Sequence, residues 1–145
     1  MKVDFLLITG TRRESKELDR VLHGVCFEYG SHETVLIVGA HTSGADRIAQ
    51  EVWGHLGFPV WAIAAPWRQF EKALGKERAR LAGPARNSAL VGAARRMMRF
   101  GLTGKVVALP DPQSRGTRDC ISELEAAGID VEVIEIGQEK LRAKP

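Results

Sequence analysis

Residues 3–10 read VDFLLITG, a short apolar run that ends in glycine. A continuous apolar run of this length, closed by a turn residue, is typical of a parallel strand that is buried on both faces. Four later segments have a similar character, and the last of them alternates polar and apolar residues as an edge strand does. They are TVLIVGA at 34–40, PVWAIAAP at 59–66, GKVVALP at 104–110 and DVEVIEIG at 130–137.

The segments between these strands have helical signals. Helices are predicted for 14–30, 43–57, 84–99 and 116–128 from apolar spacing and end signals. Gly30 is the expected C-cap of the first helix, and Pro84 suits the first position of the third, where a missing N–H costs nothing. Strands that alternate with helices predict an α/β fold: a single-domain, Rossmann-like, doubly wound and mostly parallel sheet of about five strands, with helices on both faces.

The composition is that of one ordinary globular domain. The 145 residues are enough for one core, expected over 1–137 with a polar tail at 138–145. Cys26 and Cys120 form neither a disulfide framework nor a metal pattern, which favours a reducing cytoplasm, and the scattered histidines predict no metal site. No apolar run is long enough for a membrane span, and no signal peptide is expected.

The positive charge is concentrated in one part of the chain. Between residues 68 and 99, nine Arg and Lys side chains stand against two Glu, a net charge of +7 in a chain whose total is +3. Such a segment is either a solvated helix surface or a surface that faces phosphate or nucleic acid. The charge pattern alone leaves both interpretations open.

Ligands of doubly wound sheets bind outside the carboxyl ends of the strands, so each strand-to-helix junction is a candidate site. Helix N-termini at these junctions expose N–H donors that attract phosphate. At the first junction, the glycine of Thr9-Gly10-Thr11 allows close approach to the backbone, and Arg12 or Arg13 supplies a cation. An ordinary turn with two exposed arginines is an equally good interpretation of this junction alone.

At the second junction, Gly44 opens a helix and Asp46 lies in its first turn. An early Asp most often caps a helix or complements its dipole. The functional alternative is that Asp46 accepts hydrogen bonds from a ribose or orients Arg12.

At the third junction, Trp67 follows a strand and either covers the core or stacks on a base. Arg86 and Asn87 are expected in the first turn of the helix that begins at Pro84. An arginine there opposes the helix dipole. A bound anion would account for it, because arginine grips phosphate with two parallel hydrogen bonds.

At the fourth junction, Gly116 and Thr117 open a helix after a short polar loop, between Arg115 and Arg118. The glycine allows close approach to the backbone, and the threonine adds a hydroxyl to its N–H, which makes this junction a second strong anion candidate. The sequence contains neither a G-x-G-x-x-G after a strand nor a P-loop.

Five short motifs follow one another along the chain: Gly10-Thr11-Arg12, Gly44-Ala45-Asp46, Ala65-Pro66-Trp67, Gly83-Pro84-Ala85-Arg86-Asn87 and Gly116-Thr117. In this order they resemble the SLOG superfamily of Rossmann-like nucleotide-binding proteins, which includes the Smf-type DNA-processing proteins and the Lonely Guy enzymes. The similarity covers about 3–133 and is greatest to the YspA, or YpsA-related, branch, whose function is largely uncharacterised. The resemblance implies a nucleotide-binding pocket built from these motifs.

One departure from this pattern bears on catalysis. The related Lonely Guy phosphoribohydrolases have P-G-G-x-G-T-x-x-E, and their Glu helps to cleave the N-glycosidic bond of a nucleoside monophosphate. Here the paired glycines are missing and Cys120 stands in place of the Glu. A thiol cannot stabilise an oxocarbenium-like centre as a carboxylate does. Asp119 is turned about 100° away along the helix, and Glu123 lies roughly one turn deeper.

The sequence therefore favours a module that binds a nucleotide or nucleotide-derived ligand, with no cofactor of its own. The first alternative is a nucleotide-processing hydrolase that uses Asp46, Glu123 or Asp119. The second is a protein that binds single-stranded nucleic acid through its basic segment, although few aromatic residues accompany the basic ones. Apolar residues in 88–100 serve either the core or the seam of a homodimer.

Overall fold

The computed structural model describes residues 2–137, apart from the side chains of Trp67, Phe70, Ala79 and Arg80. The predicted polar tail at 138–145 lies outside the described residues. One sheet of five parallel strands forms the centre of the molecule, in the order β3-β2-β1-β4-β5. The strands are β1 (Phe5–Gly10), β2 (Val35–Gly39), β3 (Val60–Ile63), β4 (Gly104–Leu109) and β5 (Glu132–Val133).

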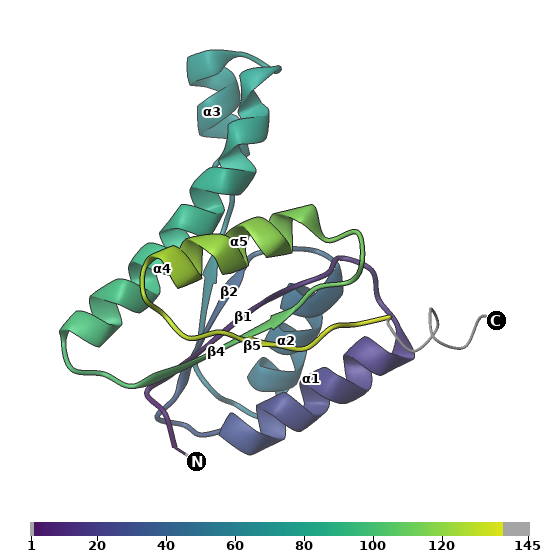
Figure 1. Cartoon of the computed structure of the whole chain (residues 1–145), viewed down its shortest axis with the longest axis vertical. Helices are drawn as coiled ribbons and strands as arrows, with labels where there is room; N and C mark the ends of the chain where they lie inside the picture. Colours follow the sequence, from purple (N-terminus) through teal and green to yellow (C-terminus); the bar gives the residue numbers. More distant parts are fainter. Residues whose placement is uncertain (1, 138–145) are drawn as a thin grey trace.

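Helices cover both faces of this sheet (Figure 1). They are α1 (Lys16–Tyr29), α2 (Gly44–His55), α3 (Trp67–Leu74), a 3₁₀ turn η1 (Arg78–Leu81), α4 (Ala82–Arg99) and α5 (Arg115–Ala126). Alternate residues of β1 enter different cores, as the pleat of a strand requires. Leu6 and Ile8 pack with α1 and α2, whereas Phe5 and Leu7 pack with α4 and α5. The predicted doubly wound α/β fold is confirmed.

The two edge strands differ from the buried centre. β5 lies at one edge, as its alternating sequence predicts, but only two of its residues form the ladder. The chain continues beside β4, because the N–H groups of Ile134 and Ile136 donate to the carbonyls of Ala108 and Pro110. β3 lies at the other edge, where Trp61 is 45% exposed.

The segment between β3 and α4 was not predicted to be helical before residue 84. The structure forms α3 there, ends it at Gly75, whose φ is +85°, and leads through η1 directly into α4. Figure 1 shows α3 beyond the end of the sheet, beside the N-terminal end of α4. On α4, Leu90 and Ala93 are buried in the core and Met98 is exposed. Within residues 2–137, no helix is long and apolar enough to cross a membrane.

Candidate functional site

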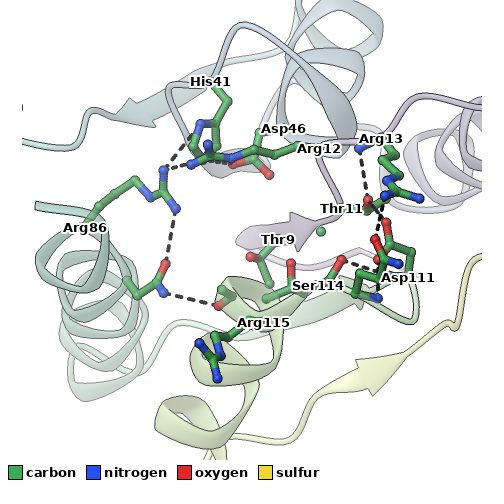
Figure 2. A pocket seen from close by; sticks show the side chains of 15 residues that line it. Thr9, Thr11, Arg12, Arg13, His41, Asp46, Arg86, Asp111, Ser114 and Arg115 are labelled. Atoms are coloured by element: carbon green, nitrogen blue, oxygen red, sulfur yellow. Dashed lines mark hydrogen bonds and ion pairs between the residues drawn. The ribbon is translucent and has the colours of Figure 1, made fainter. Parts of the chain in front are cut away.

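A cavity of about 440 Å³ opens at the carboxyl ends of β1 and β4. From the central strand β1, the sheet extends through β2 to β3 on one side and through β4 to β5 on the other. The loops after β1 and β4 therefore diverge, which is where doubly wound sheets bind ligands. Figure 2 shows the side chains that line the cavity: Thr9, Gly10, Thr11, Arg12, Arg13, His41, Asp46, Arg86, Asn87, Asp111, Gln113, Ser114, Arg115, Gly116 and Thr117.

The N-terminus of α5 forms one wall of this cavity. The N–H of Arg118 makes the first helical bond, to the carbonyl of Ser114, and the N–H of Arg115 donates to the carbonyl of Gln113. Within the described part of the chain, the N–H groups of Gly116 and Thr117 have no acceptor. The first turn of α5 contains no acidic residue. Two free donors and the positive end of the helix dipole therefore face the cavity, an arrangement that attracts an anion.

Four arginines line the cavity, against two aspartates. Arg12 and Arg13 come from the loop after β1, Arg86 from α4 and Arg115 from α5. Arg13 donates to the side-chain oxygen of Gln113 at 2.5 Å, so a hydrogen bond joins the first loop to the fourth. This excess of guanidinium groups gives the cavity a positive potential, which favours anionic ligands.

Arg86, His41 and Asp46 form a cluster at one side of the cavity (Figure 2). Arg86 donates through Nη1 to the imidazole of His41, and Nε2 of that ring lies 3.7 Å from Oδ2 of Asp46. The side chain of Asp46 is only 6% exposed. Among the described residues, its Oδ1 has no hydrogen-bond partner, and neither does Nε of Arg86. The cluster thus contains two buried polar atoms, one acceptor and one donor, to which no described residue is hydrogen-bonded.

Burial dominates the protonation of this cluster. It raises the pKa of Asp46 to about 7, although the positive charges of Arg86 and Arg12 act in the opposite direction. Burial, together with the positive charges of the same two arginines, lowers the pKa of His41 to about 4. At neutral pH His41 is therefore uncharged, and its ring accepts the hydrogen bond from Arg86.

Asp111 organises the loop after β4. Its carboxylate accepts a hydrogen bond from the Thr11 hydroxyl at 2.5 Å and one from the N–H of Gln113 at 2.7 Å. Burial acts to raise the pKa of Asp111, but these hydrogen bonds outweigh it and the pKa is lowered. Thr11 was predicted to bind ligand. Thr11 lines the cavity, and its hydroxyl donates a hydrogen bond to Asp111.

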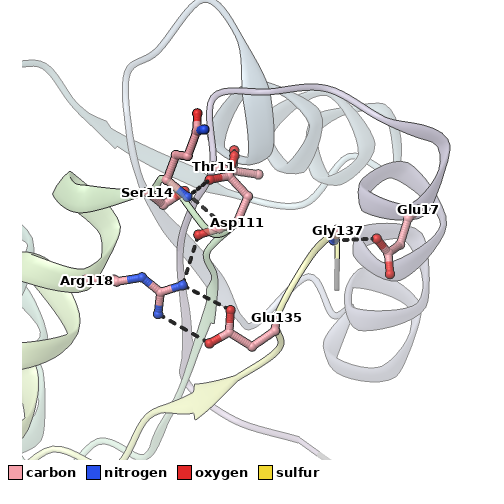
Figure 3. Close-up of polar contacts among 8 residues, drawn as sticks. Thr11, Glu17, Asp111, Ser114, Arg118, Glu135 and Gly137 are labelled. Carbon is pink, nitrogen blue, oxygen red and sulfur yellow. Dashed lines mark hydrogen bonds and ion pairs between the residues drawn. The ribbon is translucent and has the colours of Figure 1, made fainter. Parts of the chain in front are cut away.

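Figure 3 shows how the same loop is tied to the C-terminal part of the sheet. Arg118 donates to the carbonyl of Asp111 at 3.0 Å and pairs with Glu135 at 3.1 Å. The N–H of Gly137 donates to the Glu17 carboxylate at 2.8 Å, which joins the segment that follows β5 to α1. Arg118, which the sequence placed beside the anion candidate, is thus engaged with Asp111 and Glu135 and does not line the cavity.

At the second junction Asp46 lines the cavity, but Gly44 does not. The N–H of Gly44 donates to the Glu14 carboxylate at 3.0 Å, and the N–H of Ala45 donates to the Thr11 carbonyl at 2.8 Å. These donors at the start of α2 are therefore engaged within the protein. Gly44 has a φ of +80°, and a Cβ there would lie 2.3 Å from the Thr11 carbonyl oxygen, so the residue is required for close packing.

The third junction also needs a correction. Because α4 begins at Ala82 and not at Pro84, Arg86 lies in its second turn, and the argument from an unfavourable dipole does not apply. Arg86 nevertheless lines the cavity, and buried Asn87 donates to the carbonyl of Gly116 at 3.3 Å, which ties α4 to α5. The side chain of Trp67 lies outside the described part of the structure.

The three carboxylates that the sequence suggests for catalysis lie in different parts of the structure. Asp46 lines the cavity, whereas Asp119 borders a different hollow beside Arg118. Glu123 accepts a hydrogen bond from Ser88 at 2.6 Å and is not part of the cavity wall. Cys120 is fully buried, and burial raises the pKa of its thiol to about 11, so it remains a protonated core residue.

The sequence missed several residues of the cavity wall. His41 was set aside because the histidines are scattered, and Asp111, Gln113 and Ser114 were treated only as a polar loop. A signal was present in the Asp111-Pro-Gln-Ser114 run after β4, since Asp and Ser in a turn commonly bind nearby N–H groups. For His41 the sequence offers no comparable signal, because its partner Arg86 is 45 residues away.

We compared the chain with protein-family models, with curated proteins and with solved structures, and none of the three comparisons gave a match.

Proposed function

We propose that this protein binds a nucleotide or a nucleotide-derived ligand in the cavity at the ends of β1 and β4. The observation that carries the proposal is the coincidence of two unoccupied N–H donors, at Gly116 and Thr117, with four arginines in one cavity. Both features favour phosphate, and a volume of about 440 Å³ suits a small organic phosphate. Membership of the SLOG superfamily is part of the proposal and agrees with this placement.

In this proposal the phosphate lies against the N-terminus of α5. Arg115, in the first turn, and Arg86, across the cavity on α4, approach it from two sides. The loop that precedes α5 is already ordered by Asp111, which accepts a hydrogen bond from the N–H of Gln113. A preformed site of this kind loses little conformational entropy on binding.

Hydrolysis of the bound ligand is the second candidate function. A single observation favours it: a buried carboxylate, Asp46, whose pKa is raised to about 7, lies in the cavity wall. Such a group can accept and return a proton near neutral pH. The other two carboxylates that the sequence suggested are outside the cavity. The basic segment at 68–99, which spans α3, η1 and α4, supports binding of single-stranded nucleic acid only through its charge, so this remains the weaker alternative.

The test is a thermal-shift screen against nucleoside mono-, di- and triphosphates, ADP-ribose, NAD and cyclic nucleotides. A ligand at about 100 times its dissociation constant stabilises a protein by roughly 2.7 kcal/mol, which gives a clear shift of the melting temperature. Chromatography of each mixture then separates the two functions. An intact ligand supports binding alone, and a released base supports hydrolysis.

Two variants locate the site. Arg86→Ala should lose most of the ligand-induced shift, because it removes a guanidinium from the cavity. Arg95→Ala, on the exposed side of the same helix, should keep it. Equal shifts in both variants would contradict the assignment of the site, and a screen without any shift would contradict the proposed function.

A further inference from the structure

His41 lies in the loop between β2 and α2, and one atom of its ring has two neighbours of opposite charge. Nε2 accepts a hydrogen bond from Nη1 of Arg86, and the same Nε2 lies 3.7 Å from Oδ2 of Asp46. The residues come from three separate parts of the fold, the loop, α4 and α2. Figure 2 shows them together at one side of the cavity.

These two contacts of Nε2 exclude each other. To accept from Arg86, Nε2 must have a free lone pair and therefore no proton. To donate to Asp46, it must have a proton and therefore no lone pair. In the first state the ring is neutral, with its proton on Nδ1, and Nε2 is bonded to Arg86. In the second state Nδ1 keeps that proton, Nε2 gains another, and the imidazolium pairs with Asp46. The unpartnered Oδ1 of Asp46 and Nε of Arg86 indicate that the first state leaves hydrogen-bonding capacity unused.

We propose that His41 is a positioning residue whose Nε2 exchanges Arg86 for Asp46 when an anion binds, so that anion binding is coupled to proton uptake at the His41–Asp46 pair. This inference rests on the proposed function, because it requires the anion to engage Arg86. An anion that takes the Arg86 Nη1 donor removes the bond that keeps Nε2 unprotonated. It also neutralises a nearby positive charge, which makes an imidazolium less costly.

The charged groups around the pair set the direction of the effect. Arg86 faces it from α4, Arg12 from the loop after β1, and the buried Cys120 thiol from α5. With the cavity empty, the pKa of His41 is lowered to about 4 and that of Asp46 is raised to about 7. Without a bound anion, the His41–Asp46 pair therefore holds one proton below about pH 7, on Asp46, and none above it. The anion-bound pair holds one proton, on His41.

A specific pH profile follows from this difference in bound protons. Below about pH 7 both states hold one proton, and the affinity for a fully ionised anion does not depend on pH. Above it, binding takes up as much as one proton, and the affinity falls by about tenfold for each pH unit. A site with only fixed arginine charges would show no such break.

Inorganic sulfate is the appropriate probe, because it remains a dianion across this pH range and adds no titration of its own. Sodium sulfate is titrated calorimetrically into the full chain at constant ionic strength, from about pH 6 to about pH 9. We expect a constant dissociation constant at the acid end and a rise of about tenfold per pH unit above neutrality. Two buffers of different ionisation enthalpy should report proton uptake that approaches one.

Two histidine variants make the test specific. His41→Gln keeps a side-chain acceptor for Arg86 but cannot be protonated, so sulfate should still bind and the pH dependence should disappear. His55→Gln, at the exposed end of α2, should keep the wild-type profile. Thermal unfolding of both variants verifies that they are folded.

Several outcomes would overturn the inference. A pH-independent wild-type affinity, or a pH dependence that survives in His41→Gln, would show that anion binding takes up no proton at His41. Failure of sulfate to bind, while a nucleotide stabilises the protein, would overturn the inference and leave the proposed function intact. If neither sulfate nor any nucleotide binds, both the inference and the proposed function are overturned.

Discussion

The hydroxyl of Thr11 donates a hydrogen bond of 2.5 Å to Oδ2 of Asp111, 100 residues away in the chain. This bond joins the loop after β1 to the loop after β4, the two loops that border the cavity. The N–H of Arg13 donates to the same hydroxyl oxygen at 3.0 Å, so the first loop is fixed at two points. The cavity wall is therefore ordered by the protein without a ligand.

Thr11→Val tests the contribution of this bond to stability. Valine has a similar volume but leaves a buried carboxylate oxygen without its donor, which costs about 1–3 kcal/mol in the free energy of unfolding. Urea unfolding measures the loss. Thr103→Val is the matched control, because its hydroxyl bonds to Asp4 at an exposed site. Comparable losses in the two variants would contradict the proposed importance of the Thr11–Asp111 bond.

Gly10 allows α2 to approach the end of β1 closely. A Cβ at this position would lie 2.7 Å from Cβ of Ala45 and 2.9 Å from the carbonyl oxygen of Leu109. Both neighbours are buried, so neither can move away cheaply. We expect Gly10→Ala to lower the free energy of unfolding by about 1–3 kcal/mol.

Gly92 provides the control for that prediction. It lies within α4, and a Cβ there would meet nothing within 4 Å. Because alanine favours the helix more than glycine does, Gly92→Ala should raise the free energy of unfolding by about 0.5–1 kcal/mol. Opposite signs for the two variants in urea unfolding would confirm that close packing, and not glycine content, determines the result at Gly10.

Much of this fold could be predicted because its signals are local. The strands β1, β2 and β4 are continuous apolar runs, and Ser15 caps α1 through a hydrogen bond to the N–H of Leu18. The segment of α3 and η1 was missed because it has little contact with the sheet and packs mainly on itself and on α4. Its helices depend on tertiary contacts that the sequence pattern does not reveal.

The position of the site could also be predicted, but its internal chemistry could not. Parallel strands bring their following loops to one edge, so residues such as Arg12, Arg86 and Thr117 were expected near one another, and they do line one cavity. Which donors remain free depends on contacts across the fold. Glu14 occupies the N–H of Gly44, and nothing in the local sequence of either residue indicates that contact.

In the proposed relationship to the SLOG superfamily, Cys120 would stand in place of a catalytic Glu, and its environment opposes a carboxylate there. The thiol is fully buried in the core and does not line the cavity, although it lies next to Thr9 of the cavity wall. We expect Cys120→Glu to destabilise the protein by about 3 kcal/mol or more, since it would force a larger and ionisable side chain into a fully buried core position close to Asp46. Cys120→Ala should cost less. A Cys120→Glu variant that unfolds at the wild-type urea concentration would show that the side chain can reach the cavity.

The buried carboxyl of Asp46 should make the stability of the protein depend on pH. Its pKa is raised from 3.8 to about 7 in the folded state, so the native protein binds more protons than the unfolded chain between these values, and stability falls as the pH rises through them. Asp46→Asn removes this titration. Its stability relative to wild type should therefore increase between about pH 5 and about pH 8, by on the order of 2–4 kcal/mol. Urea unfolding at both pH values measures the change, with Asp119→Asn, at an exposed position of α5, as the control. A constant difference between Asp46→Asn and wild type would mean that Asp46 is not desolvated in the native protein.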